Sequence, residues 1–164
     1  MNYSPGNILR YLCVQNGLCS LPETQTAWPA YADFIPDEGA NAILFTNTTA
    51  RKDGRYMRTG ETIIHPGVQI LFRGRTQDEA YNKGKEISIF LDSVKRQQVL
   101  ITTETYRIDG VHKQGDLVPL SMEEHYKALE RQIKENKRNR FIYVLNVIMT
   151  VTGYEVSEMM TPQY

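Results

Sequence analysis

Apolar and polar positions alternate with two different periods along the chain, and each period predicts a type of element. Apolar side chains at helical spacing follow Ser4 and Pro5, a favourable N-cap and first helical residue. The same spacing predicts a longer helix over residues 77–96 and a third over 121–137, before the last strand. Alternation and short apolar runs predict strands near residues 31–36, 41–46, 63–74, 97–108 and 140–151.

This order of elements predicts the fold class. The 164 residues suffice for one core and are too few for two ordinary domains. We therefore expect a single α+β domain over residues 1–164, with a mixed, mostly antiparallel sheet and helices packed against it. The last strand is apolar on both faces, which favours a central position. Gly84 interrupts the apolar stripe of its helix, which predicts a close approach of helix and sheet.

A polar insertion separates two of the predicted strands. Residues 46–62 contain almost no apolar side chain and carry Asp53-Gly54 near their middle. The pattern predicts an exposed β-hairpin or loop. Its tip is net positive, because four basic side chains stand against Asp53: Arg51, Lys52, Arg55 and Arg58.

Composition and charge narrow the class of protein. Nineteen basic and nineteen acidic side chains cancel, which argues against a protein that coats nucleic acid and suits one that packs against copies of itself. No run reaches the ~18 apolar residues of a membrane helix, and the N-terminus lacks a signal-peptide pattern. We expect Cys13 and Cys19 to be buried free thiols of a cytoplasmic protein, with a disulfide or metal pair as the alternative.

The best candidate for chemistry is the basic corner at residues 73–75, where a strand meets a helix. A helix N-terminus flanked by two arginines can bind a phosphate. The corner lacks a glycine-rich cradle, and Asp78 and Glu79 would repel an anion. We interpret it as scaffold.

No other pattern predicts catalysis. His65, His112 and His125 are scattered without metal-ligand spacing, and no nucleophile motif is present. We therefore expect a protein that is not an enzyme and has no cofactor or metal. Basic residues cluster at 51–58 and 134–140, which leaves a nucleic-acid-binding module as one alternative function.

Five segments together resemble a known family. They are NILRYL, FIPDEGANAILF, HPGVQILFRGRTQDEAYNKGKEI, YRIDGVHKQGD and RFIYVLNVIMTV, with residues 65–87 the most specific of them. Their order is similar to that of the minor capsid or tail completion proteins of tailed phages, which are similar to the tail terminators of long-tailed phages.

The resemblance implies a structural virion protein. Such subunits form a ring, normally a hexamer, on the head-proximal end of the tail tube, made in the host cytoplasm without membrane contact. The ring stops addition of the major tail tube protein and offers a surface to the head connector or head-completion protein. Genomic DNA passes through its lumen without sequence-specific binding. A head-completion or stopper ring on the portal side is the alternative within the same group.

A closed ring needs two different complementary patches on each subunit. We expect Arg73, Arg75 and Ile89 at the subunit interface, since Ile89 lies opposite the apolar stripe of its helix. We expect Arg51, Lys52, Arg55 and Arg58 to contact carboxylates of the tail tube.

Overall fold

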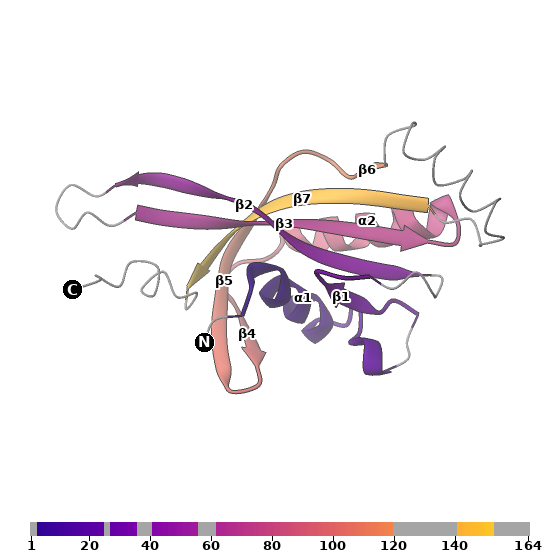
Figure 1. The fold of residues 1–164 in the computed structure, drawn as a ribbon, viewed down its shortest axis with the longest axis horizontal. Helices are drawn as coiled ribbons and strands as arrows, with labels where there is room; N and C mark the ends of the chain where they lie inside the picture. The colour runs from indigo at the N-terminus through magenta and orange to yellow at the C-terminus, as the bar shows by residue number, and fades with distance from the viewer. Residues whose placement is uncertain (1–2, 25–26, 36–40, 56–61, 120–140, 153–164) are drawn as a thin grey trace.

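In the part of the chain that the structure describes, a curled sheet carries two helices on one face (Figure 1). The computed structural model describes residues 3–24, 27–35, 41–55, 62–119 and 141–152. Within these residues the helices are α1 (Pro5–Gln15) and α2 (Gln77–Asp92), with a short 3-10 turn, η1 (Pro22–Thr24). The strands are β1 (Ala30–Ala32), β2 (Ala42–Arg55), β3 (Thr62–Gly74), β4 (Gln97–Ile101), β5 (Glu104–Lys113), β6 (Val118–Pro119) and β7 (Phe141–Thr152).

The strand order is β1-β2-β3-β7-β5-β4, and β6 also pairs with β7. Among the described strands, β1 and β2 pair in parallel, whereas the other pairs are antiparallel. The predicted α+β fold with a mixed, mostly antiparallel sheet is therefore confirmed. The position of β7 between β3 and β5 confirms the prediction that the last strand is central.

Cross-strand rows build the core. Phe72 of β3 pairs with Ile43 of β2 and with Tyr143 of β7, and the next inward row is Phe45, Ile70 and Leu145. These rows are buried against both helices, which belong to the same apolar cluster. Burying a large apolar side chain contributes about 1.5–3 kcal/mol, so this face accounts for much of the stability of the fold.

Both helices begin where the sequence predicts. The Ser4 Oγ accepts a hydrogen bond from Asn7 N at 3.3 Å, and the Thr76 Oγ1 accepts one from Glu79 N at 3.1 Å. Each bond satisfies an N–H that the first helical turn leaves without a backbone partner. Helix α2 ends at Asp92, four residues before the predicted end.

Helix α1 lies between the two edges of the curled sheet. Its Arg10 Nη1 donates to the Ala30 carbonyl of β1 at 3.0 Å, and its Gln15 Nε2 donates to the Gln98 carbonyl of β4 at 2.8 Å. Strands β1 and β4 are the two ends of the strand order. One helix thus contacts both edge strands, and each contact uses a backbone carbonyl that a strand from another molecule would need.

Two glycines allow the close contact between α2 and the sheet. A Cβ on Gly84 would lie 3.2 Å from Phe72 Cδ2 and 2.7 Å from Leu117 Cδ2, which confirms the predicted close approach. A Cβ on Gly74, at the end of β3, would lie 2.8 Å from the backbone nitrogen of Ala80. The first turn of α2 therefore packs directly on the strand that precedes it.

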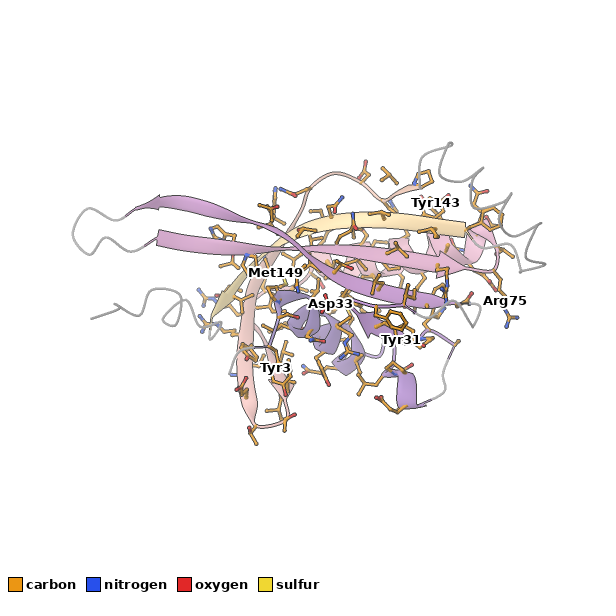
Figure 2. All side chains as sticks on the ribbon, in the orientation of Figure 1. Tyr3, Tyr31, Asp33, Arg75, Tyr143 and Met149 are labelled. Carbon is orange, nitrogen blue, oxygen red and sulfur yellow. The ribbon has the colours of Figure 1, made fainter. Side chains whose placement is uncertain are left out.

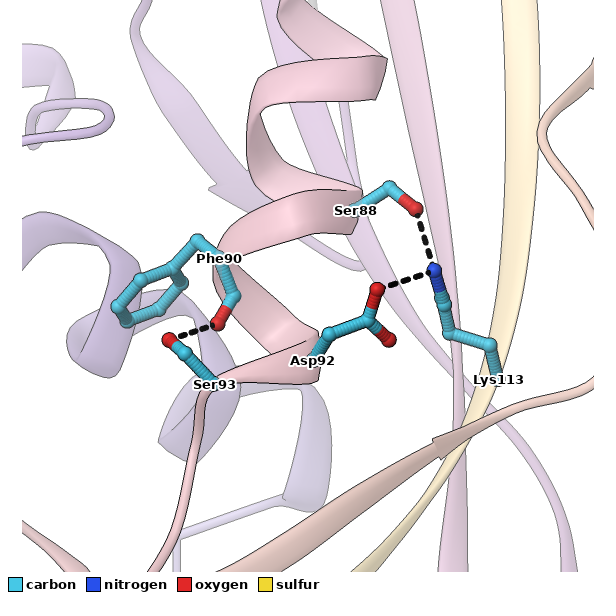
Figure 3. A network of polar contacts seen from close by, with 5 residues as sticks. All are labelled: Ser88, Phe90, Asp92, Ser93 and Lys113. Atoms are coloured by element: carbon cyan, nitrogen blue, oxygen red, sulfur yellow. Dashed lines mark hydrogen bonds and ion pairs between the residues drawn. The ribbon is translucent and has the colours of Figure 1, made fainter.

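A polar network fixes the other end of α2 to β5 (Figure 3). Lys113 Nζ donates to Ser88 Oγ and to Asp92 Oδ2, each at 2.9 Å. Ser93 Oγ donates to the Phe90 carbonyl at 2.6 Å, where the helix ends. A cation at this end is favourable, because the C-terminal carbonyls of a helix carry partial negative charge.

The predicted strand over residues 97–108 is wrong. The chain reverses between Ile101 and Glu104, which pair directly, and Thr102 adopts a left-handed φ of 55°. No residue at this turn marks it in the sequence, because tight hairpins favour Asn, Asp and Gly there and this one has Thr102 and Thr103. Asp109-Gly110, a dipeptide typical of hairpin turns, instead lies inside β5 at a register shift. The predicted helix over 121–137 lies outside the described residues.

Candidate functional site

The hairpin of β2 and β3 extends past the rest of the sheet (Figure 1). The last pair between β3 and β7 is Gly67 with Ile148, yet β2 and β3 continue to pair as far as Arg55 and Thr62. We call residues 49–55 and 62–66 the arm and the remainder of the described fold the body. The antiparallel pairing of β2 with β3 agrees with a hairpin in this part of the chain, whereas the exposure of residues 46–62 stays a prediction and residues 56–61 lie outside the described residues.

Two register shifts shape the arm. Thr48 pairs with Gly67 and Arg51 with His65, so that two residues of β2 stand opposite Pro66 alone. A second shift lies between Lys52 and Arg55 on the same strand. Each extra residue on one strand bends the ribbon and increases its twist. Asp53-Gly54 falls in the second shift.

Pro66 occupies a position that the sequence did not predict. A proline normally stands at the start of a strand or on an edge, because it has no N–H for the ladder, but Pro66 lies inside β3, four residues after Thr62. A proline is tolerated there because the residues opposite form a bulge, where regular ladder bonds are already interrupted.

The backbone places three of the four predicted tube-contact residues on one strand of the arm. Arg51, Lys52 and Arg55 belong to β2, whereas Arg58 lies outside the described residues. The arm is therefore a projecting ribbon whose sequence is strongly basic in a protein with no net charge.

The predicted subunit-interface residues are spread over the body. Arg73 is only 5% exposed, so its side chain is already buried within the single chain. Arg75 is exposed beyond the end of β3, where its backbone nitrogen donates to Asn41 Oδ1 at 3.0 Å. Figure 2 shows Arg75 at the end of the molecule opposite the arm. Ile89 is 62% exposed on the outer face of α2.

Two strongly exposed apolar side chains were missed by sequence reasoning. Phe34 is 71% exposed and follows Asp33, whose φ of 65° turns the chain after β1. Leu100 is 61% exposed on β4, between the buried residues Val99 and Ile101. Strict alternation along 97–101 could have identified Leu100, because side chains of a strand alternate between its two faces.

A buried phenol connects the N-terminus of the described chain to the β4–β5 turn. The Tyr106 hydroxyl accepts a hydrogen bond from Tyr3 N at 3.0 Å and donates one to Glu104 Oε2 at 2.5 Å. This bond from Tyr106 lowers the pKa of Glu104. Burial, and then the bond to Glu104, raise the pKa of Tyr106.

The two cysteines are free thiols, as predicted, although Cys19 is half-buried. Burial raises the pKa of Cys19 to about 12, so that little reactive thiolate forms at neutral pH. Within the described residues, no group of three or more His, Cys, Asp or Glu side chains could hold a metal ion. No described helix is long and apolar enough to cross a membrane.

Comparison with protein-family models gives a match over most of the chain. Residues 14–152 match the model described as bacteriophage tail terminator protein. The matched range includes the arm, α2 and the central strand β7. Comparison with curated proteins gave no match.

Proposed function

The chain belongs to the bacteriophage tail terminator proteins, a structural family of the virion, and we propose that it forms a ring on the tail tube. The ring caps the head-proximal end of the tube, stops addition of further tube subunits and provides the surface that joins the head. A hexamer is the number that the resemblance implies.

The arm is the observation that supports a contact with the tube. It is a two-stranded ribbon whose backbone makes no pair with β7 beyond Gly67, although the His65 side chain still contacts Thr150 of β7 at 3.2 Å. Its β2 strand carries Arg51, Lys52 and Arg55, and Arg58 follows in the sequence. Arginines form paired, charge-assisted hydrogen bonds with carboxylates. The arm therefore binds an acidic surface of the tail tube.

Subunits join in the ring through side chains rather than by strand addition. Helix α1 already donates to both edge strands of the sheet through Arg10 and Gln15. A head-to-tail ring needs two different patches, and Ile89 on α2 and Arg75 at the end of β3 belong to them. Arg73 stays a prediction for this interface.

The test replaces the four basic residues of the arm and its tip together. Arg51, Lys52, Arg55 and Arg58 are changed to Ser, and a matched control changes four exposed body cations to Ser: Lys85, Lys95, Arg96 and Arg107. Purified protein is added to isolated tail tubes, and electron microscopy scores the fraction of tube ends that carry one ring. We expect a loss of at least tenfold in capping for the arm variant and none for the control.

Three results would contradict the proposal. Normal capping by the arm variant would show that the basic residues of the arm are not needed for the contact with the tube. A wild-type protein that leaves tubes bare and binds the isolated head connector would instead indicate a stopper ring. Strong, salt-sensitive DNA binding without capping would indicate the nucleic-acid-binding alternative.

A further inference from the structure

The root of the arm has a geometry that glycine alone permits. We propose that Gly67 and the bulge of Thr49 and Ala50 form an elbow that fixes the direction of the arm and so positions it for its partner. The positioning part rests on the proposed function; the geometric part is independent of it.

The elbow is closely packed. A Cβ on Gly67 would lie 2.8 Å from the Thr49 carbonyl oxygen and still closer to Thr48 Oγ1. The Thr48 side chain can rotate away, but the Thr49 oxygen belongs to the backbone and moves only with the strand. Any side chain at position 67 therefore pushes the bulge outward.

The surrounding contacts decide which part moves. Gly67 pairs with Ile148 of β7, and beyond this pair Thr150 Oγ1 and His65 Nδ1 lie 3.2 Å apart. Both contacts hold β3 to the body. Opposite the bulge, Pro66 has no N–H to donate to β2. The bulged strand β2 is thus the side that yields, and the arm changes direction while the body keeps its register.

A small bend at the root gives a large displacement at the end. Seven residues of β2 extend from Thr49 to Arg55. At about 3.3 Å per residue the arm is roughly 20 Å long, so a bend of ~10° moves its far end by ~3–4 Å. Such a shift exceeds the tolerance of a hydrogen bond between an arginine and a carboxylate.

The chain offers a matched control for the elbow. Gly110 also lies in a strand, pairs with Thr150 of β7, and would bring a new Cβ within 4 Å of nothing described. Gly110→Ala therefore adds the same methyl group beside the same strand without pressing on the arm. Any effect specific to Gly67→Ala reports the elbow rather than the loss of a strand glycine.

The direction of the arm is measured with two spin labels. Asp53→Cys places one on the arm and Asn82→Cys one on the outer face of α2. The background carries Cys19→Ser, and Cys13 is fully buried, so the two new thiols take the label. We expect Gly67→Ala to shift the mean distance between the labels by at least ~3 Å. Its melting temperature should stay close to that of wild type, and Gly110→Ala should leave the distance unchanged.

Capping is then measured for the same variants. We expect at least a tenfold loss for Gly67→Ala and none for Gly110→Ala. An unchanged distance in Gly67→Ala overturns the elbow, whatever capping does. A shifted distance with normal capping overturns the positioning role. Normal capping by the four-serine arm variant instead contradicts the proposed contact between the arm and the tail tube. The label distances still test whether Gly67 fixes the direction of the arm. If Gly67→Ala does not fold, deletion of Ala50 removes the bulge from the opposite strand, and the elbow then predicts a change in the label distance for that variant; an unchanged distance overturns the elbow.

Discussion

The body and the arm are built from the same two strands, yet they follow different rules. In the body, β2 and β3 alternate apolar residues towards two helices, and β7 pairs with β3 as a further strand. In the arm the alternation stops, the β2 strand carries basic residues in place of apolar ones, and two bulges bend the ribbon. From this difference we expect the body to carry the stability and the arm the partner contact, so that a change in one half should have little effect on the other.

The largest effect should come from the body. Phe72 is fully buried, pairs with Ile43 and Tyr143, and packs beside Gly84 of α2. Phe72→Ala removes this packing and leaves a cavity, which costs about 3–5 kcal/mol in the free energy of unfolding. Urea denaturation followed by circular dichroism measures the change.

The arm provides the contrast to this variant. The four-serine arm variant should change the free energy of unfolding by less than about 0.5 kcal/mol, as exposed substitutions usually do. A loss comparable to that of Phe72→Ala would show that the arm also supports the core. The separation between the two halves would then fail.

A smaller effect distinguishes two glycines of the same strand. Gly74 faces the backbone of Ala80, so Gly74→Ala must push α2 away from β3. Overpacking of this kind costs about 1–3 kcal/mol. Gly67→Ala should cost less in global stability, because only the arm yields. Thermal unfolding of both variants measures the order, and an equal or larger loss for Gly67→Ala would place the elbow inside the cooperative body.

Local signals in the sequence predicted most of the body. Ser4 and Thr76 cap the two described helices as their positions suggested, and Gly84 marks a close helix–sheet contact. The strand β7 is central, as its two apolar faces indicated. These features depend on residues near one another in sequence, or on burial so complete that composition alone reveals it.

Features set by distant parts of the chain were not predictable. The bulge opposite Pro66 depends on which residues of β2 pair with β3, and a strand segment without a clear apolar face specifies its register only weakly. The turn at Thr102 has no Gly, Asn or Asp to mark it. The contacts of Arg10 and Gln15 with two opposite edges exist only once the sheet has curled. The candidate site was therefore predicted in its charge and its hairpin, but not in its direction.

The smallest effect concerns pH and lies within the body. Tyr106→Phe keeps the buried ring but removes the hydroxyl that serves Tyr3 N and Glu104, which should cost about 1–2 kcal/mol at neutral pH. The pKa of Glu104 is lower in the folded protein than its usual 4.5, so its ionised carboxylate stabilises the fold at pH above 4.5. This contribution to stability is lost as pH falls through the pKa of the folded state. The pKa of Tyr106 is higher in the folded protein than its usual 10, so its neutral hydroxyl stabilises the fold at pH below 10. This contribution is lost as pH rises through the pKa of the folded state. Tyr106→Phe should therefore flatten both limbs of the stability profile, measured by denaturation between pH 3 and about 10.5.

Tyr3→Phe, which keeps the backbone donor and loses only the hydroxyl near Thr102, should retain both limbs. If stability depends on pH with equal slopes in wild type and Tyr106→Phe, removing the hydroxyl has left the pKa of Glu104 unchanged. The bond from Tyr106 would then not be the cause of that lowered pKa.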